Sequence, residues 1–99
     1  MTEFTKEVIK TIKSIPPGKV MSYGNVADAA GNNRAARAVT YILRSRSKID
    51  ELPWHRVIGK TGQLRIKDPE GYQLQKHLLE SEGVVVSDHG FVNMDIYSF

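Results

Sequence analysis

Residues 22–46 read SYGNVADAAGNNRAARAVTYILRSR, and this stretch decides the predicted fold. Ser22 can cap a helix over residues 23–30, because a serine hydroxyl accepts a hydrogen bond from a free N–H of the first helical turn. Asn33 can cap a second helix over residues 34–46 in the same way. A short connection that contains glycine separates the two helices, and this arrangement is typical of a helix-turn-helix.

The second of these helices has two unlike faces. At 100° per residue, one stripe is cationic and the opposite stripe is apolar. The cationic stripe contains Arg34, Arg37, Tyr41 and Arg44, and the apolar stripe contains Ala35, Val39, Ile42 and Leu43. A cationic face on the second helix of a helix-turn-helix favours contact with DNA, and a merely solvated charged face is the alternative.

The N-terminal segment predicts a packing helix. Its apolar residues Phe4, Val8, Ile12 and Ile15 follow one another at spacings of four, four and three, which is one stripe of an α-helix. The segment Pro16-Pro17-Gly18 must end this helix, because proline lacks the backbone N–H and glycine favours turns.

The second half of the chain predicts a hairpin and one more helix. Glycines at 59 and 62 favour a turn, so Val57–Ile58 and Gln63–Ile66 are expected to pair as the wing of a winged-helix fold. Apolar spacing predicts a helix from Glu70 that ends at Gly83, followed by a short strand over Val84–Val86. Residues 87–99 have no readable period.

These elements predict one domain over residues 1–99, of the α+β class and mainly helical: a winged helix-turn-helix DNA-binding domain with a small hairpin wing. Its length of 99 residues and its hydrophobic content of 40% fit a single core. The N-terminus has no apolar stretch typical of a secretory signal, and no run of residues is long enough for a membrane span. We therefore expect a cytoplasmic protein with no membrane partner.

The chain contains no cysteine and only three histidines. This composition excludes disulfides, thiolate metal sites and a cysteine nucleophile, and scattered histidines make a poor zinc site. We expect no metal and no cofactor.

Positive charge is concentrated in the middle third of the chain. Residues 1–32 carry a net charge of +1, residues 33–67 carry +7 and residues 68–99 carry −5. A basic segment of this kind attracts polyanions such as nucleic acid, although it can also serve only as a solubilising face.

Five short motifs follow one another along the chain. They are Ile15-Pro16-Pro17-Gly18-Lys19-Val20, Ser22-Tyr23-Gly24, Ala35-Ala36-Arg37-Ala38-Val39, Pro53-Trp54-His55-Arg56-Val57-Ile58 and Leu78-Leu79-Glu80-Ser81-Glu82-Gly83. In this order and at these separations they resemble the DNA-binding domain of O6-alkylguanine-DNA alkyltransferases, over about Phe4 to Gly83. Trp54 stands where that family has its acceptor cysteine, so the chain is similar to the alkyltransferase-like proteins, which bind alkylated guanine without accepting the alkyl group.

The resemblance implies a function that is not enzymatic. The protein would bind double-stranded DNA containing O6-alkylguanine through the minor groove, flip the base and mark it for nucleotide excision repair, with repair proteins as partners and a monomer as the expected state. Trp54 cannot replace the cysteine, since its indole N–H is a donor and alkyl transfer needs a nucleophile. The alternatives are a winged-helix regulator without lesion preference, and a DNA-base enzyme that uses His55 and Glu82.

The resemblance also implies roles for individual residues in DNA binding. Tyr23 would crowd the phosphate 3′ to the lesion, and Arg37 would intercalate where the base was; alternatively, Tyr23 is only a helix-terminal aromatic and Arg37 a phosphate contact. Arg34 and Arg44 complete the predicted DNA-binding set. The small residues Ala35, Ala36 and Ala38 would suit the narrow minor groove.

A second group of residues is predicted to form or support the lesion pocket. Trp54 would wall it, or would be an ordinary core residue, and Arg56 would belong to the pocket or brace its loop. The segment Arg65-Ile66-Lys67-Asp68-Pro69-Glu70-Gly71 lacks the glycine-rich pattern of the transferases, and either Arg65 or Lys67 would face the flipped base or contact a phosphate. His55 and Glu82 would be a retained structural network.

Overall fold

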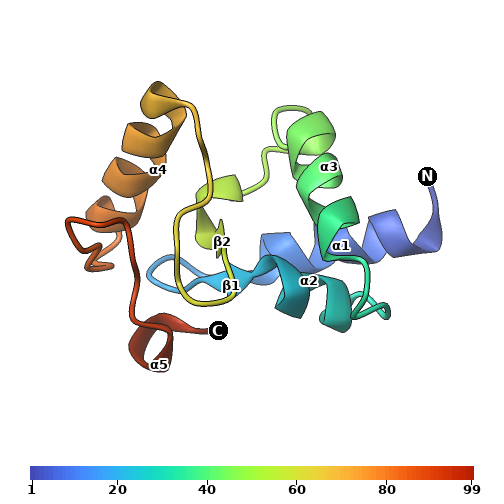
Figure 1. The fold of residues 1–99 in the computed structure, drawn as a ribbon. Helices are drawn as coiled ribbons and strands as arrows, with labels where there is room; N and C mark the ends of the chain where they lie inside the picture. The colour runs from blue at the N-terminus through green and yellow to red at the C-terminus, as the bar shows by residue number, and fades with distance from the viewer.

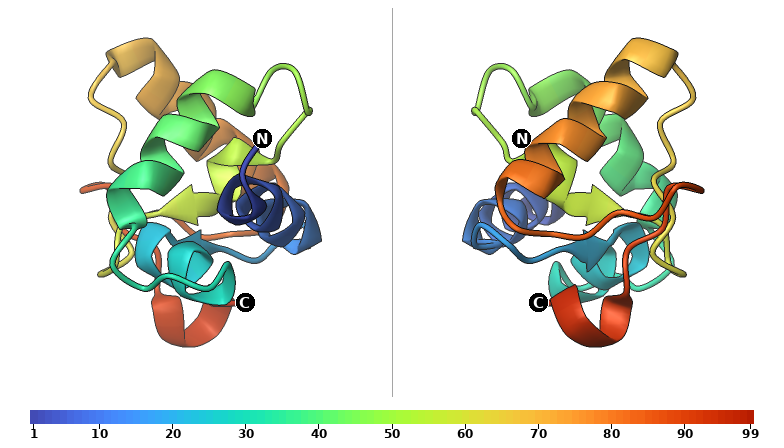
Figure 2. Two further views of the ribbon diagram at one scale, coloured as in Figure 1. Left: turned by 90° about the vertical axis from the view of Figure 1, so that its right-hand side faces the viewer. Right: turned by 90° about the vertical axis from the view of Figure 1, so that its left-hand side faces the viewer.

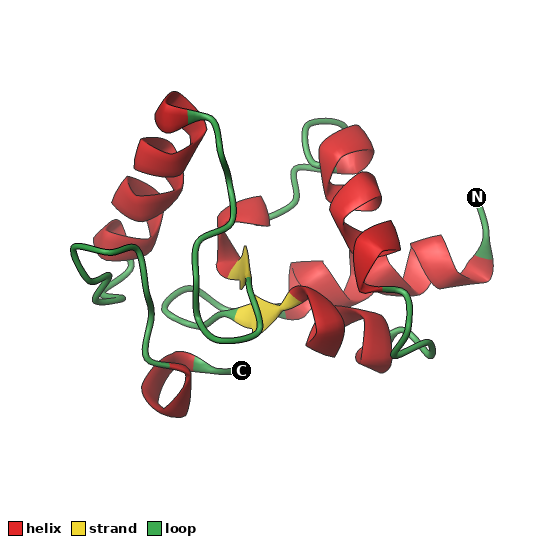
Figure 3. Cartoon of the chain, viewed as in Figure 1, coloured by secondary structure: helices red, strands yellow, loops and turns green.

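The computed structural model describes residues 1–99 and confirms the mainly helical α+β class (Figures 1 and 3). The elements are α1 (Glu3–Ser14), β1 (Met21–Ser22), α2 (Tyr23–Ala29), α3 (Ala36–Arg46), the 3-10 turn η1 (Trp54–Arg56), β2 (Val57–Ile58), α4 (Pro69–Ser81) and α5 (Met94–Tyr97). None of the helices combines the length and the apolar character needed to cross a membrane.

A two-stranded parallel sheet lies between the helices α1–α3 and the helix α4 (Figures 1 and 2). Met21 pairs with Val57, and Ser22 pairs with Ile58. Successive side chains of a strand point to opposite faces, so Val57 packs into a core with α1, α2 and α3, whereas Ile58 packs into a second core with Leu79 of α4.

The predicted hairpin between Val57–Ile58 and Gln63–Ile66 is wrong. One hydrogen bond, from Gly59 N to Gln63 O at 2.8 Å, closes the turn, but Gln63 bridges to Phe91 and β2 pairs with β1. Val57 and Ile58 are at most 1% exposed. Two such residues need a partner strand inside the molecule, and β1 supplies it, whereas a wing would leave β2 at the surface.

Helix α2 begins as predicted, and α3 does not. The Ser22 hydroxyl accepts a hydrogen bond from Asn25 N at 3.0 Å and caps α2. Helix α3 begins at Ala36 without a side-chain cap, so the predicted role of Asn33 is wrong. Asn32 instead accepts a hydrogen bond from Arg34 N at 3.1 Å, and this local turn delays the start of α3.

The C-terminal segment, which had no readable period, folds over the second core. The strand expected over Val84–Val86 is reduced to a single bridge between Val86 and Val92, and both residues are buried. Helix α5 follows, and hydrogen bonds from Val20 N to Tyr97 O and from Phe99 N to Val20 O attach the C-terminus beside β1. Val84, Val86 and Val92 are buried in the second core. Contacts with distant residues, and not a local period, therefore order this segment.

Candidate nucleic-acid interface

A hollow of about 840 Å³ opens between α3, the 65–68 segment and α4, and we call it the α3 hollow. Its lining includes most of the residues predicted for the site: Tyr23, Arg37, Arg44, Trp54, Arg65 and Lys67. They come from the start of α2, from α3, from the 3-10 turn η1 and from the 65–68 segment. The fold therefore brings residues from distant parts of the chain around one cavity. Tyr23 and Lys67, for example, are 44 positions apart in the sequence.

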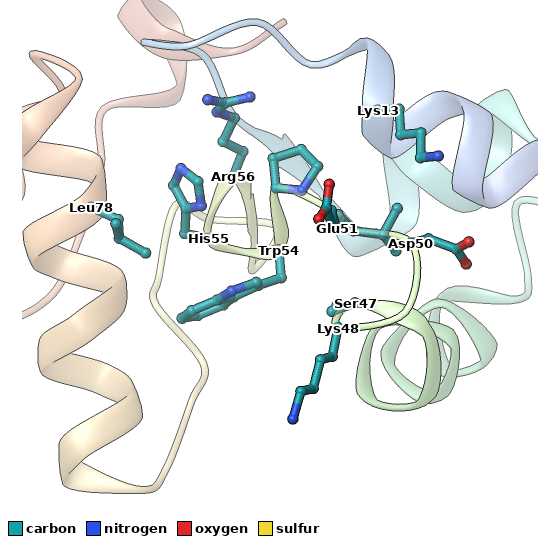
Figure 4. Close-up of a pocket in the computed structure, with 11 residues that line it drawn as sticks. Lys13, Ser47, Lys48, Asp50, Glu51, Trp54, His55, Arg56 and Leu78 are labelled. Carbon is teal, nitrogen blue, oxygen red and sulfur yellow. The ribbon is translucent and has the colours of Figure 1, made fainter.

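A second hollow of about 1030 Å³, the α1 hollow, adjoins Trp54 (Figure 4). Lys13, Lys48, Asp50, His55 and Leu78 are among its lining residues. In Figure 4 the indole of Trp54 lies between Leu78 of α4 and the Lys48 side chain. Trp54 and Ser47 line both hollows, so the two hollows meet at the half-buried indole, which is not a residue of either core.

The loop before Trp54 is held by short-range contacts. Arg46 at the end of α3 forms an ion pair with Asp50, with 2.8 Å between Nε and Oδ2. Leu52 N donates to Ser47 O at 2.9 Å, and the Leu52 side chain is buried in the core of α1–α3. Glu51 takes a left-handed backbone conformation, with φ of 52°. The loop therefore enters the 3-10 turn in a defined direction and sets the position of Trp54.

Glu82, at the end of α4, binds three residues in two other parts of the chain. Its carboxylate accepts hydrogen bonds from Arg56, the shortest being 2.6 Å from Nη2, and from Gly18 N at 3.0 Å. His55 Nε2 lies 2.8 Å from the same carboxylate. Arg56 also donates to Ile15 O at 2.9 Å. These contacts tie α4, the 3-10 turn and the turn after α1 together.

The network keeps Glu82 ionised. Burial raises the pKa of this carboxyl group. The hydrogen bonds from Arg56, His55 and the Gly18 N–H lower the pKa by more than burial raises it, to about 2. A carboxylate held in this state is a poor general base near neutral pH. The geometry fits a structural role for the network, and the predicted role of His55 and Glu82 stays a prediction.

Arg56 does not line the α3 hollow, and its predicted place in the lesion pocket stays a prediction. Its guanidinium faces Glu82 and Ile15 O, and it borders the α1 hollow instead. The ion pair with Glu82 orients the guanidinium, because both side chains are largely buried and their opposite charges hold each other. Bracing of the loop, the other role considered for Arg56, matches this geometry.

Exposed cations surround the α3 hollow. Arg37, Arg44, Arg65 and Lys67 line it and form no ion pair with a protein carboxylate. Arg34 is exposed and unpaired as well, but it precedes α3 and lies outside the hollow lining. Unpaired cations at the rim of a cavity are available to phosphates.

Tyr23, the first residue of α2, is an aromatic residue in the lining of the α3 hollow. Burial raises the pKa of its phenol, and the positive charge of Arg65 opposes this effect. The hydroxyl is therefore uncharged at neutral pH and can donate or accept one hydrogen bond.

Three polar residues of the α3 hollow were missed by sequence reasoning, Thr40, Ser47 and Gln75. Gln75 is 1% exposed, and its amide nitrogen donates to His55 O at 3.2 Å and to Val57 O at 3.3 Å. A signal was present, because Gln75 follows Tyr72 by three positions and precedes Leu79 by four, which places a polar side chain on the buried stripe of α4. No group of three or more metal-ligating side chains is present.

Comparison with known proteins gives one consistent result. The family model described as the DNA-binding domain of 6-O-methylguanine DNA methyltransferase matches residues 3–84. A DNA base-flipping protein of Vibrio parahaemolyticus is 35% identical over 99 residues, which cover 100% of this chain and 98% of that protein. A DNA base-flipping protein of Escherichia coli is 38% identical over 94 residues, which cover 95% of this chain and 72% of that protein.

A solved structure matches along the whole chain. The crystal structure of S. pombe Atl1, in complex with damaged DNA containing O6-carboxymethylguanine, superposes with a TM-score of 0.86 at 35% identity. The superposition covers 100% of this chain and 96% of the Atl1 chain.

Proposed function

Since the chain belongs to the family of the 6-O-methylguanine DNA methyltransferase DNA-binding domain, we propose that it binds O6-alkylguanine in duplex DNA and leaves the lesion intact. The observation that carries the proposal is the α3 hollow, in which Trp54 and an uncharged Tyr23 lie among unpaired cations. The names of the relatives support it, since two are called DNA base-flipping proteins and Atl1 was crystallised with damaged DNA.

Alkyl transfer to the protein has no acceptor here. The chain contains no cysteine, and an indole has no lone pair free to act as a nucleophile. The ring of Trp54, which lines the α3 hollow, instead offers a flat apolar wall and one N–H donor. A base placed against this wall is bound, and it is not changed.

The duplex approaches the face that carries α3, with the helix in the minor groove. Ala36, which lines the hollow, and the exposed Ala38 present little bulk, and this suits a narrow groove. Arg44 and Arg34 contact phosphates on either side, and Tyr41, which is 70% exposed on the same stripe, adds contact area.

Base flipping requires that the extruded base be replaced in the stack. Extrusion costs a few kcal/mol, which new contacts must offset. Arg37, at the first turn of α3, stacks between the bases and hydrogen-bonds the orphaned partner, since a guanidinium is planar and rich in donors. Tyr23 rotates the nucleotide by crowding the phosphate 3′ to the lesion.

The bound complex marks the lesion for nucleotide excision repair. This step follows from the resemblance to alkyltransferase-like proteins, because a protein that holds a lesion without repairing it needs a partner that removes the lesion. We propose further that the protein acts as a monomer in the cytoplasm.

Binding to matched duplexes, carrying guanine or O6-methylguanine at one position, tests this proposal. Salt is held constant because phosphate contacts make affinity strongly salt-dependent. We expect tighter binding to O6-methylguanine with the masses of DNA and protein unchanged, and loss of this selectivity in Trp54→Ala. Equal binding would favour a regulator without lesion preference, and a change of mass would mean an enzyme.

A further inference from the structure

Three short segments of the chain are bridged in antiparallel order beside the second core. Gln63 bridges to Phe91, and Val86 bridges to Val92. Val92 N donates to Gly62 O at 2.8 Å, so its N–H points away from Val86. In an antiparallel ladder the backbone groups of such a non-hydrogen-bonded pair point outward on both sides. The N–H and C=O of Val86 therefore lie at the outer edge, and neither group forms a backbone hydrogen bond.

The outer edge at Val86 also presents apolar side chains. Successive side chains of an extended chain point to opposite faces. Val86 and Val92 are buried, so their neighbours Val85 and Phe91 point to the solvent, where they are 69% and 41% exposed. Unpaired backbone groups beside exposed apolar side chains make a template on which an extended segment of another protein can add as a strand. We call Val85, Val86 and Phe91 the free edge.

The free edge lies in the acidic part of the chain. Residues 77–99 contain four carboxylates and no lysine or arginine. Glu82 is paired with Arg56, whereas Asp88, which follows Val86 by two positions, is exposed and forms no ion pair. This charge repels duplex DNA and attracts a protein segment that carries lysine or arginine.

The free edge is separate from the surface proposed for DNA. In Figure 1 the segment that follows α4 lies at the end of the molecule away from α3. The family model of the DNA-binding domain matches residues 3–84 and so ends before Val85, whereas the Atl1 structure matches the whole chain. A partner at the free edge can therefore bind while DNA occupies the face that carries α3.

We infer that an extended segment of the excision-repair partner, carrying apolar and basic side chains, adds as a strand beside Val86. The backbone of this segment pairs with the N–H and C=O of Val86. Its apolar side chains pack on Val85 and Phe91, and its basic side chains contact Asp88. This inference rests on the proposed function and names the surface at which the partner docks.

The test measures incision of a duplex that carries O6-methylguanine by purified nucleotide excision repair proteins of the same organism, with all of the duplex bound by this protein. Val85→Lys and Asp88→Lys should each lower the incision rate about tenfold, because a lysine at a sheet edge opposes strand addition and repels a basic segment. Ile49→Lys is the control, since Ile49 is 68% exposed and lies outside the acidic part of the chain. It should leave the incision rate unchanged.

Hydrogen exchange at Val86 gives a second measurement. Its amide should exchange rapidly in the protein bound to DNA alone and slowly once the repair proteins are added, since strand addition pairs this N–H. Unchanged incision in Val85→Lys and Asp88→Lys, or an equal loss in Ile49→Lys, would overturn the inference. Protection of the Val86 amide that rises with the concentration of this protein alone would also overturn it, because a second copy would then occupy the free edge.

Failure of the proposed function has a different signature. Absence of any preference for O6-methylguanine over guanine would refute the proposed function itself. Preferential binding to O6-methylguanine without incision by the repair proteins would leave lesion binding intact and overturn only the inference about the free edge.

Discussion

Replacing Glu82 with Gln should lower the free energy of unfolding by about 3 kcal/mol at pH 7. The Glu82 side chain is 14% exposed and bridges Arg56, His55 and Gly18 N. Its pKa falls from 4.5 to about 2 in the folded protein, and each pKa unit corresponds to about 1.4 kcal/mol of stability. An amide at this position cannot balance the charge of Arg56.

The effect of Glu82→Gln should depend on pH in a definite direction. Because the folded-state pKa of Glu82 lies below its usual value, the stabilisation is complete above about pH 4.5 and is lost as the pH falls toward about 2. At pH 3 the difference between the two proteins should shrink to about 1.4 kcal/mol.

Urea unfolding between pH 7 and pH 3, followed by circular dichroism, measures this difference. Glu80→Gln is the matched control, since Glu80 lies on the same helix, is exposed and forms no ion pair. Its unfolding curves should follow those of the unmodified protein. A loss below about 1 kcal/mol at pH 7, or a loss that stays constant with pH, would refute the account of the network given above.

The salt dependence of DNA binding tests the exposed cations around the α3 hollow. Arg44→Ala should reduce the slope of log affinity against log salt concentration by about 0.9, for damaged and undamaged duplexes alike. Lys10→Ala on α1 is the control and should leave this slope unchanged. Arg37→Ala should weaken binding to O6-methylguanine by about tenfold more than binding to guanine, because only the flipped state needs the vacated position filled; equal weakening, measured by fluorescence anisotropy, would mean a phosphate contact. Since burial raises the pKa of Tyr23, the affinity of the protein and of Tyr23→Phe should respond identically to pH from about 7 to about 9. Divergence of the two profiles would contradict a neutral phenol.

Local patterns were sufficient for α1, for the start of α2 and for the family. The stripe of Phe4, Val8 and Ile12 predicted α1, and the hydroxyl of Ser22 predicted the start of α2. The resemblance drawn from five short motifs is confirmed by the family match over residues 3–84. Periodicity and caps are properties of neighbouring residues, so they are readable before the chain folds.

Residues far apart in the chain explain what was predicted wrongly. The partner of β2 is β1, which lies 36 residues earlier, and this pairing is selected by the burial of Val57 and Ile58 between two cores. The guanidinium of Arg56 is oriented by Glu82, which lies 26 residues later in the chain. No periodic pattern in the neighbouring sequence identifies β1 as the partner of β2 or Glu82 as the partner of Arg56.

The sequence by itself determined that this protein has a cationic second helix behind a short turn, and that it has no thiol to accept an alkyl group. The tertiary structure alone decided that two hollows meet at Trp54, that Tyr23 and Lys67 border the same cavity, and that Gln75 keeps an unpaired acceptor. The physical reason is that charge and chemical reactivity belong to individual side chains, whereas a cavity exists only after distant segments have packed around it.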